Sequence, residues 1–545
     1  MSDSPFCIFM LNKPNIFSES LDDAVSFQSY PRYFGMGLGL WLLIGFMNTV
    51  GMTMPTFIPM AIVYFLAAVY RPKWFLYLVV AFFMFREAWD LMQIYSSWGV
   101  NGGFGQGRGA LAFLRYVHPG TPTTYQMPKV IWGSMLFRIL LVNRTNGKIA
   151  SVKGPQGLLY AFVLISLLSA TANLAFDKTT FRFIVELTLP FVLFFYFKTF
   201  RLTKRELQFF FGFILFTGVE MQILFNFINN YDRVIHLRIF FGDDAIGTFK
   251  HPRYEVSAWM MTFGFFLFLY RFLVHRQNSD LFRAMLAFYG VLSVSVILYT
   301  VLLMAFTLFS FLYARSTGLI KAKELALAVV AAAFLGGLVA YQLQRDAGTA
   351  AHLDRHMNKN EEREAWYMTP KVYSFINLYN MMEEEGKWFF GVGPGRFLTT
   401  YGHGYYQTRY NSYTIFETTQ LSSSERLENS TVGIIGEVGL LGYLCFILAY
   451  YHFYQQITRR NALIMRQTGK PDVAYAMVII CMLFFASLSL IRNSMEEPIL
   501  QSMIMLFVSM VYQFEWNREK ELEMAQKQAE MPGHPPVARP QPAIV

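Results

Sequence analysis

Long apolar stretches, separated by shorter polar ones, run through most of the chain. A helix needs roughly 17 to 25 apolar residues to cross a bilayer. Stretches of this length lie at 34–51, 53–70, 73–92, 156–176, 181–200, 205–228, 254–276, 324–343, 431–454, 473–492 and 497–515. The pattern therefore predicts an all-α polytopic integral membrane protein.

Two further regions add crossings. Residues 129–143 are apolar but short, and they contain Arg138. Residues 281–313 are too long for one crossing, so we expect two short helices that separate near Tyr299 and Thr300. With both regions included, the sequence predicts about fourteen transmembrane helices.

The positions of lysine and arginine test this topology, because cytoplasmic loops are enriched in both. Basic clusters fall on one side if every predicted crossing is real: Arg71 and Lys73; Arg144, Lys148 and Lys153; Lys198, Arg201, Lys204 and Arg205; Arg271, Arg276 and Arg283; Arg315, Lys321 and Lys323; Arg459, Arg460, Arg466 and Lys470; Arg518 and Lys520. We expect this side, and both termini, to be cytoplasmic.

The same topology divides the chain into three parts. Residues 1–33 form a cytoplasmic segment that lacks the features of a removable signal peptide. Residues 34–515 form the transmembrane domain. Residues 516–545, which end in a proline-rich stretch, are predicted to be a disordered cytoplasmic tail.

The composition supports the membrane class and narrows the chemistry. Hydrophobic residues make up 54% of the 545 positions, and the mean hydropathy is +0.34. A soluble core of this length could not hide so much apolar surface. The three cysteines, Cys7, Cys445 and Cys481, suggest neither a disulfide pair nor a thiolate metal cluster. Redox chemistry is therefore not expected. A nucleic-acid partner is not expected either.

Three substantial loops are predicted on the extracytoplasmic side, at about 93–128, 229–253 and 344–430. In the longest, residues 352–364 have the spacing of an exposed helix, and Trp366–Met382 have the pattern of an amphipathic helix. One dominant polar loop on the outer side favours chemistry at the membrane surface over transport of a solute through the bilayer.

Four motifs follow one another along residues 155–455. They are Gly247-Thr248-Phe249-Lys250-His251-Pro252-Arg253-Tyr254, Arg363-Glu364-Ala365-Trp366, Gly391-Val392-Gly393-Pro394-Gly395-Arg396-Phe397, and Glu428-Asn429-Ser430 through Glu437-Val438-Gly439-Leu440-Leu441-Gly442. Together they resemble the motifs of the bacterial O-antigen ligases and Wzy-type polysaccharide polymerases. Two positions depart from that family: Glu428 stands where it usually has histidine, and Arg253 stands where it usually has asparagine.

The resemblance implies a GT-C-like membrane fold with a large helical extracytoplasmic loop. It implies an enzyme of the bacterial cytoplasmic (inner) membrane whose active site faces the periplasm or exterior. The implied substrates are an undecaprenyl-diphosphate-linked glycan donor and a glycan acceptor, and the implied protein partners are a flippase and a chain-length regulator. No cofactor is expected.

The residues themselves indicate how such a donor could be bound. A lipid diphosphate leaves as an anion, which fixed guanidinium groups stabilise through forked hydrogen bonds. Arginines are numerous in the outer loops, where the positive-inside tendency should thin them. We predict Arg238 and Arg363 as catalytic residues, and Arg253, His251, Arg396, Asn429 and Arg355 as substrate-binding residues.

Glu428 is the predicted catalytic base, because it is a carboxylate at the exit of the longest loop, beside the membrane. Each of these assignments has a structural alternative. The outer arginines could pair with the glutamates of their own loop, and Glu428 could cap the next helix or pair with Arg426. Asn429 is a plausible helix N-cap, and we favour that role over substrate binding.

Metal binding is a weaker interpretation. His352 and His356 are four residues apart, but the glutamate of the zinc-protease pattern is missing. Asp243 and Asp244 have no third carboxylate nearby, and a turn before Gly247 accounts for them. We therefore expect a site without metal.

Acidic residues inside apolar stretches point to the main rival function. Charge in lipid is costly and tends to be functional, and a proton-coupled transporter would contain such acids: Glu186, Glu220, Glu255 and Glu437. We interpret Glu437 as structural, because the glycines around it allow close helix packing. A membrane scaffold is a third possibility.

The favoured prediction is an enzyme that polymerises undecaprenyl-diphosphate-linked repeat units into a surface polysaccharide by inverting glycosyl transfer. The alternative is an O-antigen ligase or oligosaccharyltransferase that passes the glycan to lipid A core or to protein. The high span count and the replacement of the family histidine by Glu428 favour the polymerase.

Overall fold

Every regular element that the structure describes is a helix. The computed structural model describes residues 27–50, 54–85, 122–145, 154–229, 254–294, 297–326, 370–397, 429–469, 471–490 and 497–529, with a few single residues between them. The helices are α3 (Tyr30–Val50), α4 (Met54–Tyr70), α5 (Pro72–Phe85), α7 (Pro122–Thr145), α8 (Pro155–Ala172), α9 (Lys178–Phe197), α10 (Lys204–Leu215), α11 (Met221–Asn229), α13 (Tyr254–His275), α14 (Asn278–Val294), α15 (Ile297–Ser316), α18 (Pro370–Glu385), α19 (Ser430–Thr468), α20 (Val473–Leu488) and α21 (Pro498–Ala529).

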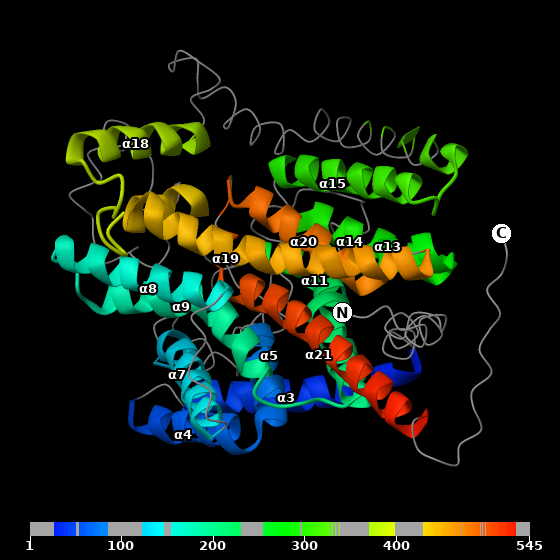
Figure 1. Ribbon diagram of the computed structural model, residues 1–545, viewed down its shortest axis with the longest axis horizontal. Coiled ribbons are helices and arrows are strands. Elements are labelled where there is room, and N and C mark those ends of the chain that lie inside the picture. The colour runs from blue at the N-terminus through cyan, green and yellow to red at the C-terminus, as the bar shows by residue number, and fades with distance from the viewer. Residues whose placement is uncertain are drawn as a thin grey trace, which may run out of the picture.

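The helices form one layered bundle (Figure 1). Helix α19 runs through the middle, packed against α8 on one side and α20 on the other. Helices α13, α14 and α15 extend the bundle beyond α20, while α3, α4, α5 and α7 form its lower part. Helix α18 lies over the end of α19, and α21 crosses the bundle obliquely against α9.

Six of the described helical segments are long and apolar enough to cross a membrane: Pro155–Ala172, Thr179–Phe197, Lys204–Asn226, Val256–His275, Tyr299–Ser316 and Ser430–Arg466. Shorter apolar helices accompany them at Phe57–Tyr70, Pro72–Phe85, Val473–Leu488 and Pro498–Phe514. The prediction of an all-helical, multi-pass membrane protein is confirmed at this level.

Burial separates central from peripheral spans. The apolar window of α13 is 94% buried inside the protein, whereas that of α8 is only 28% buried. A helix that leaves apolar side chains uncovered at the edge of a bundle is suited to contact with lipid, which is as apolar as those side chains. Helix α13 therefore belongs to the centre of the bundle and α8 to its periphery.

Both doubtful crossings of the sequence analysis are helical. Residues 129–143 lie within α7. Residues 281–313 form parts of α14 and α15, which separate between Val294 and Ile297, a few residues before the predicted break at Tyr299 and Thr300.

Two helices are longer than the sequence pattern predicted. Helix α19 continues from Ser430 to Thr468, past the predicted end at 454, with its basic residues in the added turns. Helix α21 continues to Ala529, so the prediction of a disordered tail is wrong for residues 516–529. Both extensions are polar, and hydropathy alone marks only the part of a helix that lies in lipid.

A π-helical turn, η4 (Phe216–Glu220), joins α10 to α11. The amide of Gln222 donates a hydrogen bond to the Thr217 carbonyl at 3.2 Å, which satisfies a backbone group that the wider turn frees. Gly264 of α13 faces this turn so closely that a Cβ there would lie 2.2 Å from Val219. At the end of the turn, the carboxylate of Glu220 accepts a hydrogen bond from the Tyr30 hydroxyl.

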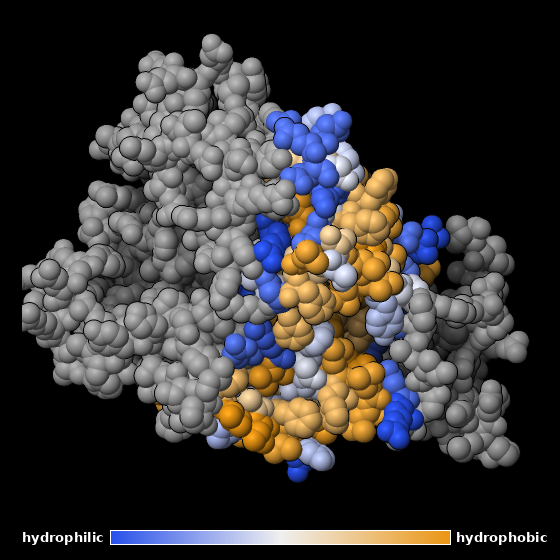
Figure 2. All heavy atoms as spheres, turned by 90° about the vertical axis from the view of Figure 1, so that its left-hand side faces the viewer, coloured by the Kyte–Doolittle hydropathy of each residue, from blue (hydrophilic) through white to orange (hydrophobic). Residues whose placement is uncertain are grey.

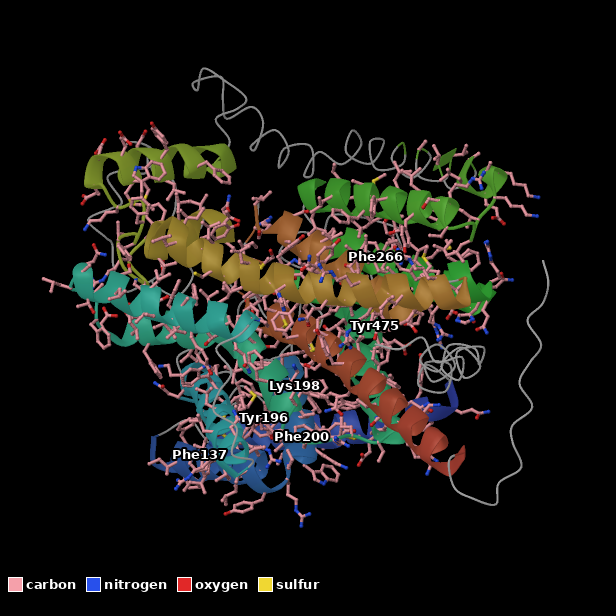
Figure 3. All side chains as sticks on the ribbon, in the orientation of Figure 1. Phe137, Tyr196, Lys198, Phe200, Phe266 and Tyr475 are labelled. Carbon is pink, nitrogen blue, oxygen red and sulfur yellow. The ribbon has the colours of Figure 1, made fainter. Side chains whose placement is uncertain are left out.

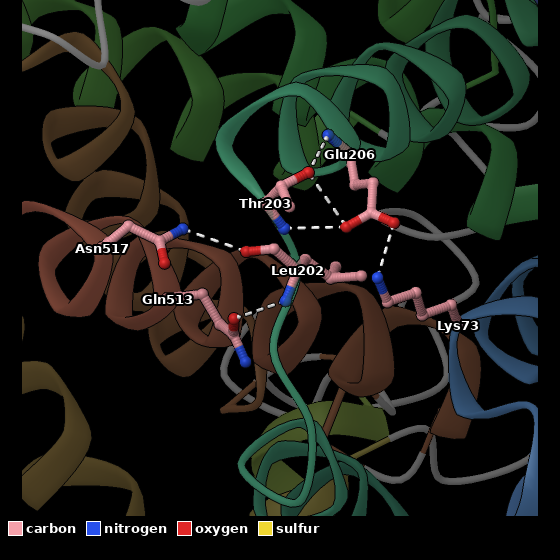
Figure 4. Close-up of polar contacts among 6 residues, drawn as sticks. All are labelled: Lys73, Leu202, Thr203, Glu206, Gln513 and Asn517. Atoms are coloured by element: carbon pink, nitrogen blue, oxygen red, sulfur yellow. Dashed lines mark hydrogen bonds and ion pairs between the residues drawn. The ribbon is translucent and has the colours of Figure 1, made fainter. Parts of the chain in front are cut away.

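The connector between α9 and α10 is held by side chains of α21 (Figure 4). Gln513 accepts a hydrogen bond from the Leu202 amide at 3.1 Å, and its own amide donates to the carbonyls of Phe197 and Phe200 at 2.9 and 2.8 Å. Asn517 donates to the Leu202 carbonyl at 3.0 Å. The backbone polar groups of this connector are thus satisfied without water.

Candidate functional site

The segment 388–397, which holds the Gly391–Phe397 motif, docks on the first part of α19. Two backbone hydrogen bonds join them directly: Val392 N–H donates to the Gly436 carbonyl at 2.9 Å, and Gly393 N–H donates to the Glu437 carbonyl at 3.0 Å. In the other direction, Leu440 N–H donates to the Trp388 carbonyl at 2.9 Å. Two of the sequence motifs, separated by some forty residues of chain, are therefore in direct contact.

A break in α19 makes these backbone groups available. Gly439 has φ 71° and ψ 178°, which interrupts the helix without ending it. In an unbroken helix Leu440 N–H would bond to the Gly436 carbonyl. Here the break separates the two groups, and segment 388–397 supplies a new partner for each. Segment 388–397 thus provides hydrogen-bond partners for the backbone groups that the break in α19 leaves unpaired within the helix.

Glycine is required along this contact for steric reasons. A Cβ on Gly391 would lie 2.5 Å from the Glu437 carbonyl carbon, one on Gly436 would lie 2.1 Å from the Phe397 ring, and one on Gly439 would lie 2.2 Å from the Phe389 carbonyl oxygen. Gly391 and Gly439 also have positive φ angles, 66° and 71°. The close packing predicted from the glycines of α19 is real: segment 388–397 is the partner at Gly436 and Gly439, whereas a Cβ on Gly442 would lie 3.4 Å from Ile165 of α8.

Glu437 uses its side chain in the same contact. Its carboxylate accepts a hydrogen bond from the Gly395 amide at 2.6 Å, and the residue is fully buried. Its carbonyl also accepts from the Ser169 hydroxyl of α8 at 3.0 Å. Glu437 therefore joins α8, α19 and the docked segment, as expected of a structural residue.

The turn between α8 and α9 borders the docked segment from the other side. The amide of Asn173 donates to the Gly391 carbonyl at 3.0 Å and its oxygen accepts from the Lys387 ammonium at 2.8 Å. Asp177 caps α9 by accepting from the amides of Thr179 and Thr180. The same aspartate pairs with Arg396, whose Nη2 lies 3.2 Å from Oδ2.

Arg396 is thus the predicted substrate-binding arginine whose position the structure describes. Its ion pair with Asp177 is partly exposed, since the two side chains keep 23% and 26% of their surface. Such a pair contributes little to stability.

Exposed apolar residues accompany these charges. Leu174 is 91% exposed and Phe176 is 70% exposed, both in the turn between α8 and α9, and Phe389 lies exposed in the docked segment. Leu174 holds a left-handed conformation with φ 51°, which is uncommon for this residue type. Hydrophobic and hydrophilic residues are interleaved on the end of the molecule that faces the viewer in Figure 2. A surface of this kind suits an amphipathic ligand or the interface of a bilayer.

Asn429 is the N-cap of α19, as predicted. Its side-chain oxygen accepts from the Val432 amide at 3.2 Å, and its side-chain amide donates to the Leu490 carbonyl at 2.7 Å. The next residue, Ser430, accepts from the Met495 amide at 3.1 Å. The start of α19 is therefore fixed to the end of α20. A substrate-binding role for Asn429 stays a prediction.

The remaining site predictions fall outside the described residues: Arg238, His251, Arg253, Arg355, Arg363 and Glu428, and with them the metal alternatives at Asp243, Asp244, His352 and His356. Their roles stay predictions.

The sequence analysis missed Asn173, Asp177 and Lys387. Asp177 could have been found, because an aspartate two residues before Thr179 at the start of an apolar stretch is a common N-cap pattern. Asn173 and Lys387 could not, since their pairing joins positions that are far apart in the chain and belong to no motif.

The acids inside apolar stretches have partners where the structure describes their side chains. Glu186 pairs with Arg182 of the preceding turn at 2.7 Å, and Glu220 binds Tyr30. The side chain of Glu255 lies outside the description.

No family model matches the chain, and no curated protein is significantly similar to it.

Proposed function

We propose that this protein is an integral membrane glycosyltransferase that takes a glycan from an undecaprenyl-diphosphate carrier at the extracytoplasmic face. The favoured activity is polymerisation of repeat units into a surface polysaccharide. The alternative is transfer of the glycan to lipid A core or to protein, as in O-antigen ligases and oligosaccharyltransferases.

The observation that carries this proposal is the contact between two of the resembled motifs. Gly391–Phe397 and Glu437–Gly442 belong to two of the motifs that carry the resemblance, and they meet through backbone hydrogen bonds and through approaches that only glycine permits. Motifs that resembled the family by chance would have no reason to meet. The contact also fixes both ends of residues 398–428, which contain Arg409 and Glu428.

The proposed reaction is a displacement at the anomeric carbon. The acceptor hydroxyl oxygen forms the new bond to that carbon, its proton passes to Glu428, and the bond to the diphosphate oxygen breaks. Arg238 and Arg363 stabilise the departing diphosphate by charge-assisted hydrogen bonds. The donor is bound by Arg396, which is partly exposed beside Asp177, together with Arg253, Arg355 and His251. Glu428 stands where the resembled family usually has histidine.

The test is complementation of a deletion strain with Arg363→Ala, Arg238→Ala and Glu428→Gln, followed by gel analysis of surface glycan. Loss of polymer with a single repeat unit retained supports the polymerase. Loss of all attached glycan supports the ligase. Normal glycan in all three variants, with protein amounts equal to wild type, refutes the proposed site. Activity in the presence of a chelator tests the metal-free mechanism.

One observation favours the transporter as a second candidate. Glu220 is an ionisable group inside a span, it binds the Tyr30 hydroxyl, and it ends a π-helical turn, a feature that often marks functional sites. If the protein is a proton-coupled transporter, Glu220→Gln abolishes solute uptake in a strain whose surface glycan stays normal.

A further inference from the structure

A second polar cluster lies at the opposite, lysine- and arginine-rich end of the spans. Lys198 follows the last residue of α9, Arg460 lies on α19, and Tyr512 lies on α21. The Lys198 ammonium is 4.4 Å from the centre of the Phe194 ring and 5.2 Å from that of Tyr512. The Arg460 guanidinium is 4.5 Å from the centre of the same Tyr512 ring. Two cations therefore share one aromatic ring.

The ring that the two cations share is held in place. The Tyr512 hydroxyl donates to the Gln456 side chain, and the Phe194 ring packs against the Tyr512 ring edge-on, with centres 5.2 Å apart. The neighbouring Gln513 binds the connector after α9, on which Lys198 lies. Figure 3 shows Lys198 at this end of α9, near Tyr196 and Phe200. The ring that both cations contact is thus fixed by packed helices.

The two positive charges lie close enough to repel each other. Among the residues that the structure describes, no carboxylate pairs with Lys198. Desolvation by the surrounding protein lowers the pKa of Lys198 to about 8, and the positive charge of Arg460 contributes to the lowering. Each cation is also attracted to the shared ring.

Lys198 is not needed to cap α9. Cations near a helix C-terminus commonly satisfy its last carbonyls. Here Gln513 already donates to the carbonyls of Phe197 and Phe200, and the Thr199 hydroxyl donates to the Tyr196 carbonyl. The Lys198 ammonium instead lies over the rings of Phe194 and Tyr512, and the Lys198 side chain is exposed.

The cluster also lies at the edge of the apolar region. The apolar span of α9 ends at Phe197, directly before Lys198, and the apolar part of α21 ends at Phe514, two positions after Tyr512. Phospholipid phosphates lie at this depth, and basic pockets between transmembrane helices bind the headgroups of anionic lipids.

We propose that Lys198 and Arg460 together bind the phosphate of an anionic phospholipid at the boundary of the bilayer. The phosphate lies between the ammonium and the guanidinium and accepts charge-assisted hydrogen bonds from both. Bound lipid then joins α9 to α19 and, through the shared ring, to α21. The proposal does not depend on the glycosyltransferase assignment.

The test uses the full-length protein in an uncharged detergent and measures its thermal unfolding with added lipid. Phosphatidylglycerol should raise the apparent unfolding temperature of wild type more than phosphatidylcholine does, because a ligand that binds the folded state stabilises it. Lys198→Met with Arg460→Gln should lose this excess, with an apparent affinity at least tenfold weaker. Arg459→Gln removes the same charge one residue away on the exposed surface of α19 and should keep the excess.

Two further arms make the result decisive. Lys198→Arg keeps the positive charge and should keep the larger effect of phosphatidylglycerol. If the double variant does not fold, Lys198→Met alone replaces it and should likewise lose the larger effect of phosphatidylglycerol. An excess that survives the loss of both cations overturns the proposal. So does an equal excess with inorganic phosphate at the same concentration, since that result would identify a soluble anion rather than a lipid as the ligand.

Discussion

Replacement of Gly439 by alanine should destabilise the protein strongly, because the position combines two steric demands. Its backbone angles, φ 71° and ψ 178°, lie in a region that is almost exclusive to glycine. A Cβ would also lie 2.2 Å from the Phe389 carbonyl oxygen, so segment 388–397 would have to move away. Backbone strain and the lost Leu440–Trp388 hydrogen bond together give a cost of about 2–4 kcal/mol.

Cys481 provides the assay, because its side chain is fully buried in α20 and becomes reactive only on unfolding. In a background in which Cys7 and Cys445 are serine, a thiol-reactive fluorophore reports the unfolding temperature during heating. Gly439→Ala should lower it by several degrees.

The matched control is Gly133→Ala in the interior of α7, where a Cβ meets no neighbour within 4 Å. There alanine should be neutral or stabilise the helix by up to about 1 kcal/mol. If Gly439→Ala unfolds at the same temperature as Gly133→Ala, the break in α19 does not hold segment 388–397 in the way described.

Three other predictions test separate parts of the structure. Gln513→Ala should lower the free energy of unfolding by about 2–3 kcal/mol, since three backbone groups lose their partner. Lys73→Ala breaks an exposed ion pair with Glu206 and should lower the free energy of unfolding by less than about 1 kcal/mol. Equal decreases in the unfolding temperatures of the two variants would contradict this ranking. The pKa of Lys198 is about 8 in the folded protein, against an ordinary value of 10.5, so the unfolded chain binds more protons between these two pH values. The stability of wild type relative to Lys198→Met should therefore rise as the pH is raised from about 8 to 10.5. A difference in unfolding temperature that does not change with pH would refute the shift. Arg396→Ala leaves the cap that Asp177 provides to α9 intact and should change the free energy of unfolding by less than about 1 kcal/mol. The same variant should nevertheless abolish surface glycan. Normal glycan on a gel would exclude Arg396 from the donor site.

The all-helical class could be predicted because it depends on hydropathy, which is written locally in the chain. The N-cap at Asn429 was equally accessible, since an asparagine before an apolar stretch has few other uses. The ends of α19 and α21 were not, because their final turns are polar and are stabilised by helix continuity rather than by burial in lipid.

The contact between the two motifs could not be derived from spacing. Glycines at positions 433, 436, 439 and 442 recur every third residue, which is typical of close packing between helices. Only the positive φ of Gly439 shows that the helix is interrupted and that its partner is a loop. A backbone angle of this kind depends on what the chain meets in three dimensions, so no local pattern encodes it.

Segment 388–393 is held on α19 by main-chain atoms and by the absence of side chains at three glycines. The side chains of Phe389 and Phe390 are exposed and can therefore be exchanged without loosening the attachment, whereas Val392 is buried in it. The side chains displayed at this end of the molecule can therefore diversify while the architecture beneath them stays the same.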